Sequence, residues 1–149
     1  MEKLTVLLPF VELPPEHTCD GGDVSPPLEL RGLCAESVAI VALNPFEPGC
    51  SFATWIIWNL DPLPFIPRDI PKVPVVERPL RALQGTNDFG EIGYRGPCPP
   101  PGESHRLLFK VYGLDGQIDL EPGASKHALN DALKGHVVQF GTTVAMYTR

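Results

Sequence analysis

Proline interrupts this chain so often that it limits where regular secondary structure can form. Eighteen prolines and fourteen glycines make up about a fifth of the 149 residues, close to the composition of disordered chains. The apolar runs between them indicate a folded protein instead. They are rich in Val, Ile, Thr and aromatic residues, which favour strands. The predicted strands are 3–10, 37–43, 53–60, 105–114 and 137–148.

The predicted strands differ in how much of each should be buried. The runs 37–43 and 53–60 are apolar almost throughout, as central strands covered on both faces are. The run 105–114 alternates between apolar and polar positions, so one of its faces should be exposed. The tract 61–79 cannot be a central strand, because each of its prolines removes a ladder donor. We expect it to be a long ordered crossover.

One segment, 124–135, has a helical period and ends in a glycine that suits a helix C-terminus. It predicts a helix of about three turns. Its apolar stripe consists of Ala128, Leu129, Ala132 and Leu133. Numerous strands with one short helix near the C-terminus predict a single, mainly β domain over residues 1–149. We expect an antiparallel two-sheet β-sandwich with the helix packed at its end.

The charge balance excludes some classes of partner. Twelve Lys and Arg face eighteen Asp and Glu, a net charge of −6, and no basic stripe could neutralise a nucleic-acid backbone. The apolar run before Pro9 is too short for a signal-peptide core or a membrane span. We therefore expect a cytoplasmic protein without a spanning segment. No motif implies a cofactor.

Cys19, Cys34, Cys50 and Cys98 are widely spaced and form no CxxC pair, which argues against a zinc ribbon. In an ordinary cytosol free thiols are expected, whereas intracellular disulfides are plausible in hyperthermophiles. The sequence does not choose among the pairings. The stretch CDGGDVSPPLEL (19–30) faintly resembles a calcium loop but lacks its later acidic ligands. Its aspartates should instead organise a turn by accepting backbone N–H bonds.

The most rigid stretch of the sequence lies directly before a strand. Prolines fix the backbone along 97–101, and His105 then opens the strand 105–114. The loop 93–101 can offer backbone N–H groups, and His105 a ring nitrogen, to a small anion or polar headgroup. The alternative is a structural histidine bonded to a backbone carbonyl. A less favoured alternative pairs Cys98 with His105 as nucleophile and base of a hydrolase.

Three motifs taken together resemble the phosphatidylethanolamine-binding protein family. They are CDGGDVSPPLEL, QGTNDFGEIGYRGPCPPPGESHRLLFKVYGLD (84–115) and ALKGHVVQFGTTVAMYTR (132–149). The resemblance spans residues 3–148 and is closest to the bacterial and archaeal branch, often called Raf-kinase-inhibitor-like. It implies a sandwich of two antiparallel sheets, an anion pocket at the surface and no established catalytic activity. Members bind phosphate-bearing headgroups or other anions, and several inhibit proteases or kinases.

The resemblance assigns the pocket walls to the loop Gly96–Pro99, including Pro97, and to His105. It also implies that loops carrying the family motifs hold both Cys19 and Cys98. A disulfide involving either of them is therefore a further alternative to free thiols.

The chain departs from the family at the other pocket positions. Asn44 and Phe46 stand where the family typically has aspartates, and Thr54 stands where it has a histidine. Neighbouring carboxylates favour a charged imidazole, so His105 loses that support here. Asn44 and Thr54 can still bond a polar group, while Phe46 should narrow the cavity.

We therefore expect a non-catalytic ligand-binding or regulatory protein with an altered pocket and weakened affinity for a small anion or phospholipid headgroup. The alternative function is inhibition of a protein target, such as a serine protease or a kinase, through a surface loop. The resemblance also makes a homodimer reasonable.

Overall fold

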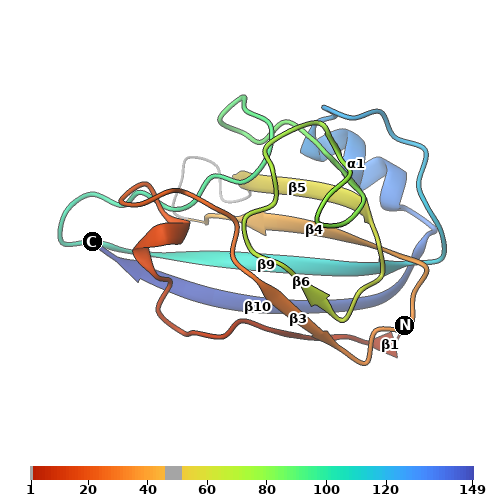
Figure 1. Cartoon of the computed structure of the whole chain (residues 1–149), viewed down its shortest axis with the longest axis horizontal. Coiled ribbons are helices and arrows are strands. Elements are labelled where there is room, and N and C mark those ends of the chain that lie inside the picture. The colour runs from red at the N-terminus through yellow and green to blue at the C-terminus, as the bar shows by residue number, and fades with distance from the viewer. Residues whose placement is uncertain (1, 46–51) are drawn as a thin grey trace.

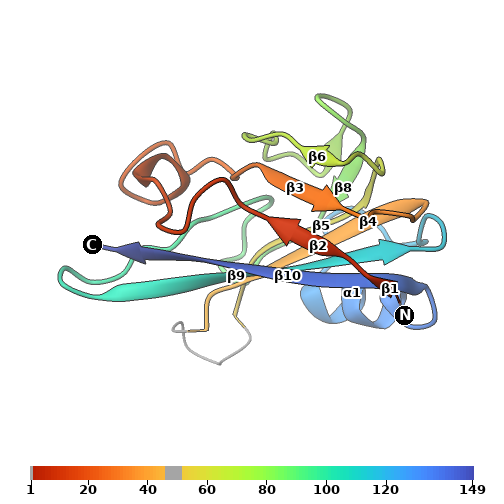
Figure 2. The ribbon, with the colours of Figure 1, turned by 90° about the horizontal axis from the view of Figure 1, so that it is seen from below.

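The computed structural model describes residues 2–45 and 52–149, and its strands form two stacked sheets (Figures 1 and 2). The small sheet has the order β2 (Thr5–Leu7), β3 (Leu28–Arg31) and β6 (Phe65–Ile66). The large sheet has the order β1 (Glu2–Lys3), β10 (Val137–Thr148), β9 (Ser104–Leu114), β4 (Ser37–Leu43), β5 (Ala53–Leu60), β8 (Ala82–Gln84) and β7 (Val75–Val76). The predicted mainly β, two-sheet fold is confirmed.

The predicted central strands are central. Alternate residues of β4 point to opposite sides, with Ile40 in the core between the sheets and Val41 in the core on the outer face of the large sheet. All seven residues of β4 are buried. Strand β9 is half buried, as its alternation predicts, with Leu107 and Phe109 fully inside.

The N-terminal run predicted as one strand is divided between the two sheets. Strand β1 pairs with β10 in parallel, the exception to the antiparallel arrangement we expected, and β2 pairs with β3. The chain crosses β10 at Gly141, where a Cβ atom would lie 2.0 Å from the carbonyl oxygen of Leu4. Glycine allows the crossing chain to lie directly on β10.

The proline-rich tract forms no central strand, as predicted. It contains β6 and β7, each two residues long and each at the edge of its sheet. Edge positions tolerate proline because one side of the strand makes no ladder bonds. A short 3₁₀ turn, η1 (Pro15–His17), lies in the segment between β2 and β3.

The helix is present but lies elsewhere than expected. Helix α1 (Lys126–Leu133) has eight residues, about two turns, and Ser125 caps it by accepting from the N–H of Ala128. Its buried Leu129 and Leu133 belong to the core on the outer face of the large sheet. The helix therefore covers a face of the sheet opposite the small sheet, and our placement at the end of the sandwich was wrong (Figure 2).

Candidate ligand site

Three polar side chains are buried where neighbouring strands of the large sheet begin or end. Asn44 follows β4, Thr54 lies in β5 and His105 lies in β9, with exposed fractions of 1%, 0% and 7%. Asn44 Nδ2 lies 3.3 Å from His105 Nδ1. An amide nitrogen can only donate, so the contact suits a ring that accepts at Nδ1. The structure thus brings Asn44 and His105 into contact.

Thr54 lies on the strand beside β4 but has a different partner. Its hydroxyl donates to the carbonyl oxygen of Ala42 over a long 3.4 Å. Its own carbonyl oxygen accepts from the N–H of Arg95 at 3.0 Å, which attaches the loop 93–101 to the end of β5. Phe46, the remaining predicted pocket residue, lies outside the described residues.

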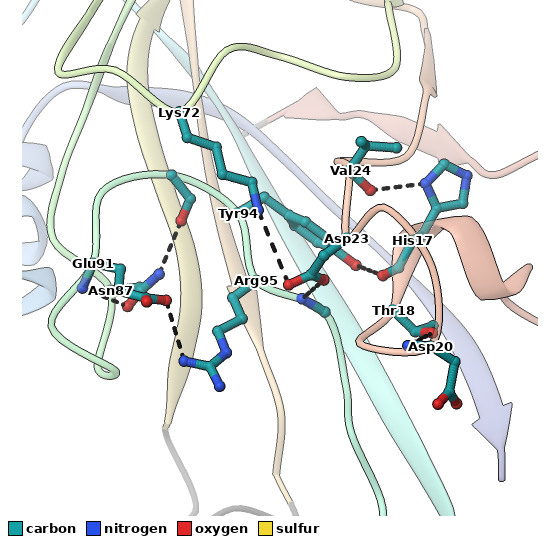
Figure 3. Close-up of polar contacts among 12 residues, drawn as sticks. His17, Thr18, Asp20, Asp23, Val24, Lys72, Asn87, Glu91, Tyr94 and Arg95 are labelled. Atoms are coloured by element: carbon teal, nitrogen blue, oxygen red, sulfur yellow. Dashed lines mark hydrogen bonds and ion pairs between the residues drawn. The ribbon is translucent and has the colours of Figure 1, made fainter.

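The loop 93–101 is held against the N-terminal loop by contacts at Tyr94 and Gly96, and Figure 3 labels Tyr94, His17 and Asp23. A Cβ atom on Gly96 would lie 2.0 Å from the carbonyl oxygen of His17, so only glycine fits against that segment. The N–H of Gly96 donates to Asp23 at 2.7 Å, and the hydroxyl of Tyr94 donates to the His17 carbonyl at 2.7 Å. Gly96 therefore directs its N–H toward Asp23, contrary to our expectation that it could serve an anion.

The same two loops are joined covalently. Cys19 and Cys98 form a disulfide with an S–S distance of 2.06 Å, so the expectation of free thiols is wrong for this pair. The contact between Asp23 and Gly96 holds the loops together and brings the cysteines within bridging distance. Cys34 is free and exposed, as expected, and Cys50 lies outside the described residues.

The disulfide also affects the hydrolase alternative. A nucleophile must be a thiolate, and the sulfur of Cys98 is bonded to Cys19. The pairing of Cys98 with His105 therefore lacks its nucleophile in this structure. Pro97 and Pro99 are buried, and the carbonyl oxygen of Pro99 accepts from Arg149 Nη1 at 3.3 Å.

The sequence model of the phosphatidylethanolamine-binding protein family matches residues 6–148. This chain belongs to that family. The resemblance inferred from the motifs is confirmed. A UPF0098 protein of Pyrococcus horikoshii is 46% identical over 140 residues, covering 92% of this chain and 71% of the relative. A UPF0098 protein of Methanothermobacter thermautotrophicus is 39% identical and covers 92% and 91%.

Two solved structures show the same phosphatidylethanolamine-binding protein fold. A putative homolog from Chlamydia trachomatis has a TM-score of 0.85 at 27% identity, covering 99% of this chain and 98% of its own. YbcL of E. coli, described as a member of the mammalian family, has a TM-score of 0.84 at 26% identity and covers 98% of each chain. Within the described residues, no helix is long and apolar enough to cross a membrane.

Beside the family's Gly-Pro loop lies a polar cleft that our sequence analysis missed. It has a volume of about 470 Å³, and residues lining it include Cys19, Asp23, Lys72, Tyr94 and Arg95. Lys72 Nζ lies 4.0 Å from Asp23, and burial, with the charge of Asp23 second, raises the pKa of Tyr94 well above its usual value. The cleft joins segments distant in sequence, and no local motif marks Lys72.

Arg95, at the edge of the same cleft, is held by two contacts. Its guanidinium pairs with Glu91 at 3.2 Å and lies 4.1 Å from the ring centre of Phe89. Asn87 fixes the adjoining turn by accepting from the N–H groups of Phe89 and Glu91. Both cations of the cleft therefore lie beside carboxylates, which balance their charge.

The two aspartates of the CDGGD stretch have separate roles. Asp23 accepts a backbone N–H, as predicted, although the donor belongs to a distant loop. Asp20 instead accepts from the hydroxyl of Tyr147 and pairs with Arg149 at 3.3 Å. Among residues 2–45 and 52–149, no cluster of three or more His, Cys, Asp or Glu side chains could hold a metal ion. The two aspartates beside glycines identified this loop in the sequence. They did not indicate which distant residues the aspartates would contact.

Proposed function

We propose that this protein is a non-catalytic binding protein for a small phosphate-bearing anion, with its site at Asn44, Thr54 and His105. The observation that carries the proposal is the buried contact between Asn44 Nδ2 and His105 Nδ1. Apart from these positions, β4, β5 and β9 present mainly apolar residues to the protein interior. Polar side chains are costly to bury, so a buried polar group at the strand ends requires a reason beyond packing.

The kind of contact favours a binding role. Asn44 and His105 bond each other through side-chain atoms, and a ligand could exchange such a contact without breaking a backbone ladder. The imidazole of His105 and the side-chain amide of Asn44 are both groups that can donate to a phosphate oxygen. No carboxylate belongs to this trio, so nothing in it enforces a cationic ring. We therefore expect weak binding, with a dissociation constant on the order of 1 mM.

The test is an NMR titration of the protein with inorganic phosphate and with phosphorylethanolamine. We expect saturable shifts of the His105 ring signals and of the backbone amide signals of Asn44, Thr54 and their neighbours. In His105→Ala the amide signals should no longer shift. Because His105 is buried, His105→Gln serves as a second variant that keeps a polar side chain in place. His136→Ala, an exposed histidine beside Asp115, is the matched control and should bind as the natural protein does. Unchanged binding in both His105 variants would contradict the proposal.

A further inference from the structure

The disulfide between Cys19 and Cys98 lies at the surface, with both residues exposed. Most structural disulfides are protected from reductants by burial or by their low potential, whereas exposed ones are more open to exchange. The two sulfur atoms of this bond also have different surroundings. Cys19 lines the polar cleft beside the Gly-Pro loop, whereas Cys98 lies next to Arg149.

Arg149 is positioned to stabilise a negative charge on Cys98. Its Nη1 atom lies 3.5 Å from the sulfur of Cys98 and also donates to the carbonyl oxygen of Pro99. Its Nη2 atom pairs with Asp20 at 3.3 Å, and Asp20 accepts in turn from Tyr147. The guanidinium is therefore held in place from several directions. A thiolate released at Cys98 would have a cation in direct contact, which favours that sulfur as the leaving group.

We propose that Cys19–Cys98 is a site of thiol–disulfide exchange with dithiol reductants, opened by attack on Cys19 and release of Cys98. A reductant thiolate enters from the cleft and forms a bond to the sulfur of Cys19. The Cys19–Cys98 bond breaks, and its electron pair leaves on Cys98 as a thiolate beside Arg149. The reductant is then bonded to Cys19 through its first sulfur. Its second thiol, deprotonated, attacks that first sulfur and releases Cys19 as a thiolate. The dithiol ends as a disulfide, and the two protein thiolates take protons according to the pH.

Opening this bond should loosen the loop without unfolding the domain. Gly96 keeps its bond to Asp23, and Tyr94 keeps its bond to His17. The segment 97–101 loses its covalent link to the N-terminal loop, so its backbone should open more often. The exchange depends on the disulfide, the cleft and Arg149. A failure to bind phosphate at His105 would therefore not affect this proposal.

The test uses the full chain with Cys34→Ser and Cys50→Ser, so that only the bridged pair can react. The folded protein is treated with glutathione, free thiols are blocked with N-ethylmaleimide, and peptides are mapped by mass spectrometry. We expect glutathione on Cys19 and maleimide on Cys98, with the reverse adduct at least tenfold rarer. Arg149→Gln should slow the opening several-fold at pH 7. Arg31→Gln, which removes a surface arginine paired with Glu29, should not change it.

Two results would overturn the proposal. One is glutathione on Cys98 as often as on Cys19, together with an unchanged rate in Arg149→Gln. The other is reduction by dithiothreitol no faster than global unfolding, measured by circular dichroism in the same buffer. Hydrogen exchange of the reduced protein provides a second readout. It should show faster exchange at the amides of Cys98 and Gly102, because the prolines of 97–101 carry no N–H, with β4 and β9 as protected as before.

Discussion

The two ends of the large sheet are closed by different kinds of polar contact. At the end where β4 begins, one buried and one half-buried side chain bond the main chain of the loops. Gln139 accepts from the N–H of Cys34 and donates to the carbonyl of Gly32, each at 2.7 Å. Asn59 bonds both the N–H and the carbonyl of Ile118. At the end where β4 finishes, the side chain of Asn44 contacts that of His105.

This difference distinguishes side chains that stabilise the fold from side chains that could bind a ligand. An amide bonded to two main-chain groups cannot change partners without leaving them unsatisfied, so it is committed to the fold. A contact between two side chains can be exchanged for a ligand at lower cost. At the His105 end the backbone is instead secured by the loops themselves, through the Asp23 bond to Gly96 and the disulfide. The loops make that end rigid, and the polar side chains at the strand ends can therefore bind a ligand.

The largest effect should follow from Gly96→Ala. Its Cβ atom would lie 2.0 Å from the His17 carbonyl, and two main-chain segments would have to separate. We expect a loss of about 3 kcal/mol or more in the free energy of unfolding, measured in guanidinium chloride. Gly102→Ala is the control, because it has a positive φ of 85° but open space around its Cβ, and it should cost about 1 kcal/mol. Equal losses in the two variants would show that the loop is not held at Gly96.

The comparison between the ends is tested directly by Gln139→Ala and Asn44→Ala. The first removes the buried amide that bonds both the N–H of Cys34 and the carbonyl of Gly32, and it should cost about 2 kcal/mol. The second removes the side-chain amide that contacts the His105 ring and should cost about 1 kcal/mol. Phosphate titration should show the opposite ranking, with binding impaired in Asn44→Ala and retained in Gln139→Ala. If Asn44→Ala proved the more damaging to stability, Asn44 would be a structural residue and the distinction would fail.

The sequence predicted what depends on local composition and missed what depends on distant contacts. The bounds predicted for 37–43 and 53–60 are those of β4 and β5, because continuous β-favouring runs end at turn residues. The contact between Asp23 and Gly96 spans 73 positions and the disulfide spans 79. No periodicity encodes such distances, and only the family motifs indicated that these loops belong together. The position of α1 was missed for the same reason. Apolar residues on both sides of β4 show that both faces are covered, but not which face is covered by the helix and which by the small sheet.

High pH should weaken the loop end of the molecule through Tyr94. Burial raises the pKa of Tyr94 in the folded state above its ordinary value of 10.0, and the charge of Asp23 adds to this. Below pH 10 both states keep the proton, so Tyr94 adds no pH dependence. Above pH 10 the unfolded chain releases the proton and the folded state retains it, so stability falls by up to about 1.4 kcal/mol per pH unit.

Tyr94→Phe should remove most of this decline. The variant should lose about 1 kcal/mol at pH 8, because the His17 carbonyl loses its donor, yet fall less steeply between pH 10 and 11. The pKa of Tyr112 is also raised by burial, so Tyr112→Phe should flatten the curve too, but by less, because Tyr112 is only partly buried. Denaturant unfolding at each pH measures both. A natural protein whose stability stays constant through pH 11 would contradict the assignment.

The smallest effect is also the one that probes the chemistry of the site. In Asn44→Asp a carboxylate replaces the amide 3.3 Å from His105 Nδ1, and this favours a ring protonated on both nitrogens. The new pair carries no net charge, but it presents a cationic donor to the anion.

At pH 6 phosphate should bind about threefold more tightly to Asn44→Asp than to the natural protein, a gain of roughly 0.6 kcal/mol in binding free energy. At pH 9 the new carboxylate should repel the more highly charged phosphate, and binding should become weaker than in the natural protein. Gln117→Glu adds the same charge at an exposed position near the opposite end and should shift neither value. Titrations at the two pH values therefore yield curves that cross only for Asn44→Asp. Parallel curves would mean that the ligand does not contact the Asn44 and His105 pair.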